Sequence, residues 1–64
     1  MQNIKTLAKE VKIQAEAIQD HRLMFGETPI PLNRVIRTLC SAKVTDSAID
    51  EYDLDLLYRE AMDA

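Results

Sequence analysis

The only glycine and both prolines of this 64-residue chain fall within one short stretch, residues 26–31. Gly26 suits the C-terminal cap of a helix, Pro29 cannot continue that helix, and Pro31 can occupy the first position of the next one. The rest of the chain is rich in alanine, leucine, isoleucine, lysine and glutamate. This composition argues against both disorder and an all-β fold. We therefore predict an all-α fold.

The residues before this stretch predict one long helix, over about residues 3–24. Apolar side chains recur there at an interval of seven, with Leu7 at one intermediate position: Ile4, Leu7, Val11, Ile18 and Phe25. This spacing places them on one face of a helix. Ala8 and Ala15 flank that face, and their small side chains allow a second helix to approach closely.

The residues after the stretch predict a second helix, over about residues 31–43. Its apolar side chains follow the i, i+3, i+4, i+7, i+8 pattern of a helix that faces a core: Leu32, Val35, Ile36, Leu39 and Cys40. Lys43 lies near the expected end, where a positive charge complements the helix dipole.

A third helix is predicted over residues 46–62. Thr45 can cap its start, Asp46 favours the positive end of the helix, and Val44 and Ile49 have the spacing of a hydrophobic staple. Three helices on a single chain predict a small three-helix bundle over residues 1–64.

The apolar residues of this third segment cluster on two nearly opposite faces. One face holds Ala48, Ile49, Tyr52 and Leu56, and the other holds Leu54, Leu57, Tyr58 and Ala61. A terminal helix cannot bury both faces in one bundle. Either the helix breaks near Asp53, whose side chain would cap a second segment, or one face contacts another chain. We favour the second interpretation.

Size also raises the expectation of self-association. A chain of 64 residues is near the lower limit for folding alone, because apolar burial barely offsets the conformational entropy of ordering it. Cys40 is the only cysteine and His21 the only histidine, so neither a disulfide within the chain nor a structural zinc site can form. Helix packing, or dimerisation that completes the bundle, must supply the stability.

Charge divides the chain into two parts. Residues 1–43 carry a net charge of +3, whereas residues 46–64 carry −6, which gives the overall −3. The acidic part is also rich in large apolar side chains. Such a segment can pack against a core and still present a negative face to a basic partner.

These features predict a small non-catalytic intracellular regulator or inhibitor that binds another protein through its acidic and apolar C-terminal helix. The expected apolar anchors are Tyr52, Leu54, Leu57 and Tyr58. The expected steering charges are Asp50, Asp53 and Asp55. The expected partner is a basic protein, with a nucleic-acid-binding protein as one candidate, and a homodimer is an additional expectation.

Two other classes of function stay open. The second and third helices have the lengths of a helix-turn-helix. A DNA-binding dimer could contact DNA through Lys5, Lys9 and Lys12 or through Arg34 and Arg37. Acidic residues on the reading helix would repel phosphate, however, so direct binding to nucleic acid is disfavoured. A purely structural homo-oligomer is the third class.

The sequence contains no pattern that predicts an enzyme, a metal site or a cofactor site. Phosphate-loop, dinucleotide-loop and hydrolase motifs are missing. We expect Cys40 to be a small buried hydrophobe and His21 to lie at the boundary of a packed helix. No apolar run reaches the length of a membrane span, no signal peptide is evident, and a cytoplasmic location is expected.

Overall fold

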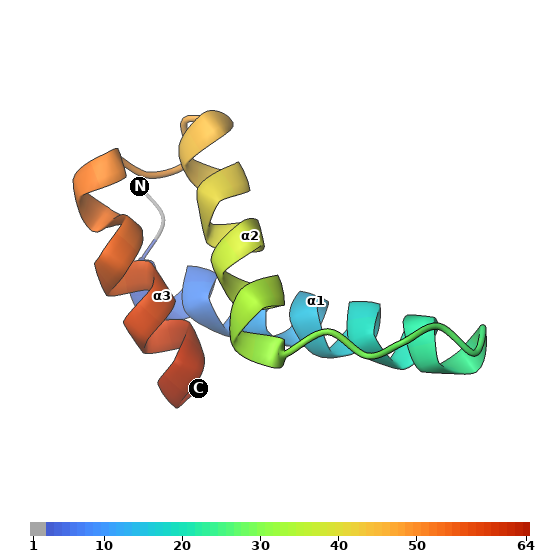
Figure 1. Cartoon of the computed structure of the whole chain (residues 1–64). Coiled ribbons are helices and arrows are strands. Elements are labelled where there is room, and N and C mark those ends of the chain that lie inside the picture. The colour runs from blue at the N-terminus through green and yellow to red at the C-terminus, as the bar shows by residue number, and fades with distance from the viewer. Residues whose placement is uncertain (1–2) are drawn as a thin grey trace.

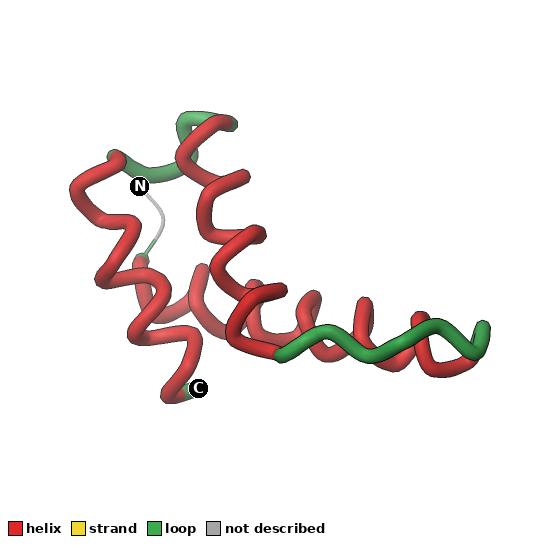
Figure 2. Tube along the Cα trace, in the orientation of Figure 1, coloured by secondary structure: helices red, strands yellow, loops and turns green. Residues whose placement is uncertain are grey.

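The computed structural model describes residues 3–64 and confirms the all-α fold (Figures 1 and 2). Helix α1 spans Ile4–Met24, α2 spans Leu32–Thr45, and α3 spans Leu54–Asp63, preceded by the short 3-10 helix η1 at Glu51–Asp53. Each of the three α-helices packs against the other two. None of the helices in residues 3–64 is long and apolar enough to cross a membrane.

Hydrogen bonds cap both ends of α1. The Asn3 side chain accepts a hydrogen bond of 2.8 Å from the Lys5 N–H at the start. At the other end Gly26 has a φ of 72°, and its N–H donates to the Leu23 carbonyl at 3.1 Å. The Glu27 N–H donates to the Arg22 carbonyl at 2.9 Å. These two bonds form a Schellman motif, so the predicted role of Gly26 is confirmed.

The second helix begins one residue later than predicted and ends two residues later. Pro31 lies just before α2 and its carbonyl accepts hydrogen bonds from Arg34 and Val35. Val44 and Thr45, predicted to start the third helix, instead complete α2, and Asp46 is its C-terminal cap. The Thr45 hydroxyl donates to the carbonyl of Ser41 at 3.2 Å, within its own helix.

A second Schellman motif closes α2, and this motif explains why the third helix starts late. The Ser47 N–H donates to the Val44 carbonyl at 3.0 Å, and the Ala48 N–H donates to the Lys43 carbonyl at 2.9 Å. Ser47 has a φ of 62°, in the left-handed region. A left-handed residue cannot continue a right-handed helix, so the chain turns away after residue 46.

We expect Ser47→Gly to stabilise the protein. The left-handed conformation costs a non-glycine residue about 1–2 kcal/mol, and the added flexibility of glycine in the unfolded chain offsets about 0.4–1 kcal/mol of the gain. The net gain in the free energy of unfolding, measured by urea denaturation followed by circular dichroism, is about 0.5–1 kcal/mol.

The matched control for this change is Ser41→Gly, at an exposed position inside α2. Glycine in a helix interior costs about 0.5–1 kcal/mol, so the control should lose stability where Ser47→Gly gains it. Equal losses in the two variants would contradict the left-handed conformation at residue 47.

The predicted continuous helix over residues 46–62 is not formed. Asp50 is extended, with a ψ of 152°, and the Asp53 N–H donates to the Asp50 carbonyl at 2.9 Å to close η1. Residues 46–50 are not helical and the regular helix begins only at Leu54, so the segment is interrupted near Asp53, which is the alternative that the sequence analysis did not favour. The Asp53 side chain makes no capping hydrogen bond to α3.

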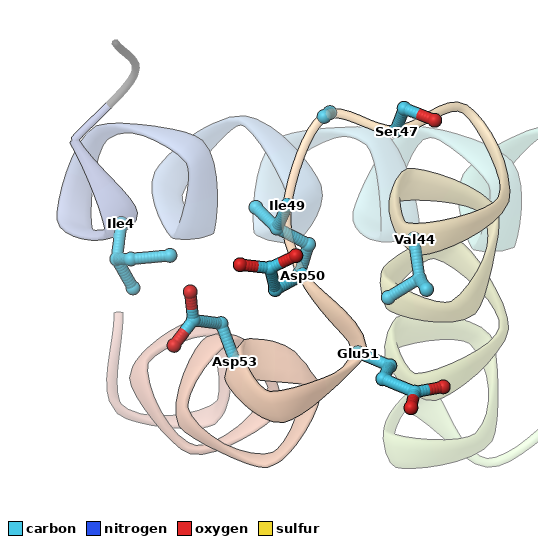
Figure 3. Close-up of a pocket in the computed structure, with 8 residues that line it drawn as sticks. Ile4, Val44, Ser47, Ile49, Asp50, Glu51 and Asp53 are labelled. Carbon is cyan, nitrogen blue, oxygen red and sulfur yellow. The ribbon is translucent and has the colours of Figure 1, made fainter.

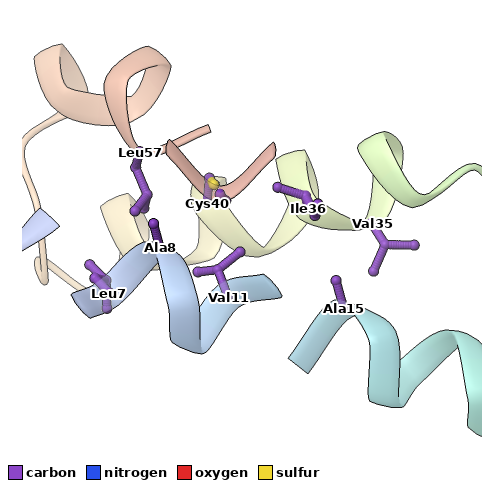
Figure 4. Close-up of a cluster of buried hydrophobic side chains, with 9 residues drawn as sticks. Leu7, Ala8, Val11, Ala15, Val35, Ile36, Cys40 and Leu57 are labelled. Carbon is purple, nitrogen blue, oxygen red and sulfur yellow. The ribbon is translucent and has the colours of Figure 1, made fainter. Parts of the chain in front are cut away.

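The core consists of small and medium apolar side chains from all three helices (Figure 4). Its buried members are Leu7, Ala8, Val11, Ala15, Val35, Ile36, Cys40, Leu57 and Ala61. Several of them are alanines, which allow the close helix contacts predicted for α1. The heptad pattern of α1 is only half buried, because Ile18 and Phe25 are 40% and 70% exposed.

The second half of α1 extends beyond the other two helices, and residues 26–31 run back beside it (Figure 1). Two side chains attach this return segment to α1. The Gln19 side-chain amide donates to the Ile30 carbonyl and its oxygen accepts from the Ile30 N–H. The Arg22 guanidinium donates to the Thr28 carbonyl at 2.8 Å and lies 3.8 Å from the Glu27 carboxylate.

Candidate protein-binding surface

The predicted anchor residues divide between the surface and the core. Tyr52, in η1, is 89% exposed. Leu54 and Tyr58 are partly buried and pack against the core. Leu57 is completely buried, so its assignment as a residue that contacts a partner is wrong. The reason is that α3 packs on α1 and α2 through the face that holds Leu57 and Ala61.

The exposed apolar residues of this region lie outside the buried face of α3. Leu56 is 44% exposed and Met62 is 42% exposed, and Tyr52 lies four residues before Leu56. Neither Leu56 nor Met62 was among the predicted site residues. The opposition of the two faces was visible in the sequence, but nothing in it showed which face the core would bury.

The predicted steering acids lie around these apolar residues. Asp50 and Asp55 are exposed and Asp53 is partly buried. Two further acids, Glu51 and Asp63, are exposed at the two ends of the segment. We define the η1–α3 surface as Tyr52, Leu56 and Met62 together with Asp50, Glu51, Asp53, Asp55 and Asp63.

Arg37 of α2 connects this surface to the rest of the bundle. Its guanidinium lies 3.6 Å from the Asp55 carboxylate and 5.2 Å from the centre of the Tyr58 ring. Both contacts join α2 to α3, and a cation over an aromatic ring adds attraction to the ion pair. Because both partners of the ion pair are exposed, these contacts add only modestly to the packing of α3 on α2.

A hollow of about 570 Å³ opens beside η1 (Figure 3). Its walls include the apolar side chains of Ile4, Val44 and Ile49. The carboxylates of Asp50 and Asp53 lie in the same hollow, near Ile4 and Ile49. Apolar walls with carboxylates beside them suit a lysine or arginine side chain, whose aliphatic stem and charged head need both surroundings.

Within residues 3–64 no group of acids, histidine and cysteine is arranged to hold a metal ion.

The two residues with reactive side chains lie away from this surface. Cys40 is completely buried, as predicted, and burial raises the pKa of its thiol, partly opposed by the positive charge of Arg37. The thiol is therefore neutral near pH 7 and packs as a small apolar group. His21 is exposed on the extending half of α1, where its ring meets the Phe25 ring edge to face at 4.7 Å.

The connection between α2 and α3 differs from that of a helix-turn-helix. Eight residues separate the end of α2 at Thr45 from the start of α3 at Leu54, whereas the DNA-binding motif has a turn of about three or four residues. In addition, η1 and α3 carry most of the acids of the C-terminal segment. The geometry gives no support to a DNA-reading role for α3.

The sequence matches no known protein family, and no curated protein and no solved structure matches the chain. The functional argument therefore depends on the exposed side chains and their surroundings. Among these, the η1–α3 surface combines the most exposed aromatic ring with the densest group of acids.

Proposed function

We propose that this chain is a small non-catalytic intracellular regulator or inhibitor that binds a basic protein through the η1–α3 surface. The observation that carries the proposal is Tyr52, a tyrosine that is 89% exposed in a chain with three aromatic residues of the Phe, Trp and Tyr types. An exposed tyrosine on an ordered element loses little conformational entropy on binding, and tyrosine is enriched among residues that dominate binding energy.

The backbone around Tyr52 supports this role. The residue lies in η1, which follows the α2 cap and leads directly into α3, so both of its neighbouring elements are packed on the bundle. Leu56, four residues further along the chain in α3, adds a second exposed apolar side chain. Two neighbouring apolar side chains ringed by polar groups resemble the centre of a protein interface with its rim.

The acids determine the chemistry of the partner. In residues 3–64 only Asp55 of this surface forms an ion pair within the chain; Asp50, Glu51, Asp53 and Asp63 have none. Unpaired carboxylates favour a positively charged partner, mainly by raising the association rate and orienting the encounter. A lysine or arginine of the partner would enter the hollow between Asp50 and Asp53. A nucleic-acid-binding protein fits this chemistry, since the acids would take the place of phosphates.

The experiment is a quantitative capture of proteins from the cells that make this chain, at low and high salt. The baits are the wild type, Tyr52→Ala, and the triple variant Asp50→Asn, Asp53→Asn and Asp55→Asn. The control removes three exposed acids from α1 by Glu10→Gln, Glu16→Gln and Asp20→Asn, which gives the same change in charge.

A direct partner should bind Tyr52→Ala about 30-fold more weakly, which corresponds to a contribution of about 2 kcal/mol. It should bind the triple variant more weakly and with less dependence on salt, and it should bind the control as it binds the wild type. If every captured protein binds all four baits equally, or responds equally to both triple variants, the proposal is wrong.

A further inference from the structure

A second surface of the bundle is an apolar groove on the side of α2 away from α3. Its volume is about 300 Å³. We define the α1–α2 groove by the residues that line it: Ile18 and Arg22 of α1, Ile30 of the return segment, and Arg34, Val35, Thr38 and Leu39 of α2. Figure 1 shows that α2 and the extending half of α1, which carry most of these residues, meet at an angle.

This groove continues the core of the bundle. The core stripe of α1 runs through Val11 and Ala15, and Ile18 is the next residue on the same face. Val35, at the boundary, is 7% exposed and points toward Ala15 (Figure 4). On the other side of α2 the corresponding angle is filled by α3 (Figure 1). The described residues provide no fourth helix for the groove.

The charges at the groove favour an acidic occupant. Arg22 and Arg34 both line it, and Arg34 forms no ion pair within residues 3–64. Arg22 is partly neutralised by Glu27 at 3.8 Å. Two copies that met groove to groove would bring these arginines together, and two copies that met through their η1–α3 surfaces would bring the acids together. Like charges in contact oppose both arrangements.

We propose that the α1–α2 groove binds the η1–α3 surface of a second copy of this chain. The exposed apolar residues of that surface, Leu56 and Tyr52, would cover Ile18 and Leu39, and its unpaired acids would face Arg34. Complementary charge favours this head-to-tail contact over the two symmetric ones. The small size of the chain also favours self-association, because burial of apolar surface between copies adds stability that one small core lacks.

The inference builds on the proposed function, because it uses the same η1–α3 surface. Self-association would cover that surface, so a basic partner would have to compete with the second copy for it. A head-to-tail contact closes into a dimer if the two contacts are related by a two-fold axis, and otherwise it forms a larger ring or an open chain of copies. The mass of the assembly distinguishes these forms.

The first measurement is light scattering of the purified chain over a concentration series at low and high salt. We expect the molar mass to rise with concentration and the dissociation constant to increase with salt, because exposed charges are screened. A monomer at every concentration overturns the inference, and leaves the groove to an acidic helix of another protein.

The decisive experiment mixes two variants that each lose one half of the contact. Arg34→Glu reverses the charge at the groove and leaves η1–α3 intact, whereas Leu56→Lys disrupts η1–α3 and leaves the groove intact. We expect each variant alone to dissociate at least tenfold more readily than the wild type. An equimolar mixture should form a 1:1 complex, in which α3 of the first variant occupies the groove of the second.

The control for charge is Lys9→Glu, an exposed change of the same sign on α1, which should associate like the wild type. Failure of the mixture to associate, or loss of association in the control, overturns the head-to-tail contact. The Arg34→Glu variant also separates the two proposals. Its η1–α3 surface is uncovered, so it should still capture a basic partner if the proposed function is correct, whatever the result of the mixing.

Discussion

Replacement of Leu57 by alanine is expected to unfold most of the protein at 25 °C. Leu57 is completely buried and lies in the core beside residues of α1 and α2. Removal of a buried leucine side chain costs about 2–5 kcal/mol, because the apolar contacts are lost and a cavity remains. The core of a chain this small supplies only about 3–5 kcal/mol of net stability. Far-ultraviolet circular dichroism should show the loss of most helical signal.

The neighbouring residue provides the matched control for this prediction. Leu56 has the same side chain, lies in the same helix, and is 44% exposed. Leu56→Ala should change the free energy of unfolding by less than about 1 kcal/mol, as expected for a substitution outside the core. A folded Leu57→Ala variant beside an unfolded Leu56→Ala variant would mean that α3 packs through its other face.

The second large effect is expected for Ala15→Leu. Ala15 is completely buried on α1, and the side chain of Val35 in α2 points toward it (Figure 4). The added side chain has no space between the two helices, so they must separate or adopt strained rotamers. Overpacking of this kind costs about 1–3 kcal/mol, which should appear as a lower midpoint in urea denaturation.

Ala17→Leu adds the same atoms two residues away, at an exposed position of the same helix. Its stability should stay within about 0.5 kcal/mol of the wild type. If Ala15→Leu were tolerated equally well, the close approach of α1 and α2 at this position would be wrong.

Helices α1 and α2 were predictable because their signals are local. The residues that end α1 and start α2 lie in one short stretch, and the apolar spacing of α2 fits a single face. The exposure of Ile18 and Phe25 was not predictable, since a heptad pattern shows which residues share a face but not how far the partner helices extend along it. Here the partners end near Ala15, and the rest of that face is exposed or lines the groove.

The structure of the C-terminal segment was harder to predict because the sequence signals for a helix start conflict with the turn that the chain adopts. Thr45 and Asp46 resemble a helix start, but the chain at Ser47 adopts a left-handed turn that favours glycine, and serine gives no signal for it. The acids of the candidate site were found because charge segregates along the sequence. The burial of Leu57 could not be predicted from the sequence. The position of α3 relative to the other helices decides which of its two opposite apolar faces is covered.

We expect the two halves of α1 to differ in local stability. Residues 4–15 contain all four buried residues of α1, so we expect backbone amides there to exchange with solvent mainly when the whole bundle opens. Residues 16–24 contain no buried residue and are joined to the return segment through Gln19 and Arg22, so we expect them to open at a lower free energy than the core. Ile18 and Arg22, which form one wall of the groove, belong to this less stable region. We therefore expect a molecule that binds the groove to slow hydrogen exchange in that half of α1, because binding stabilises the folded form of the residues that it contacts.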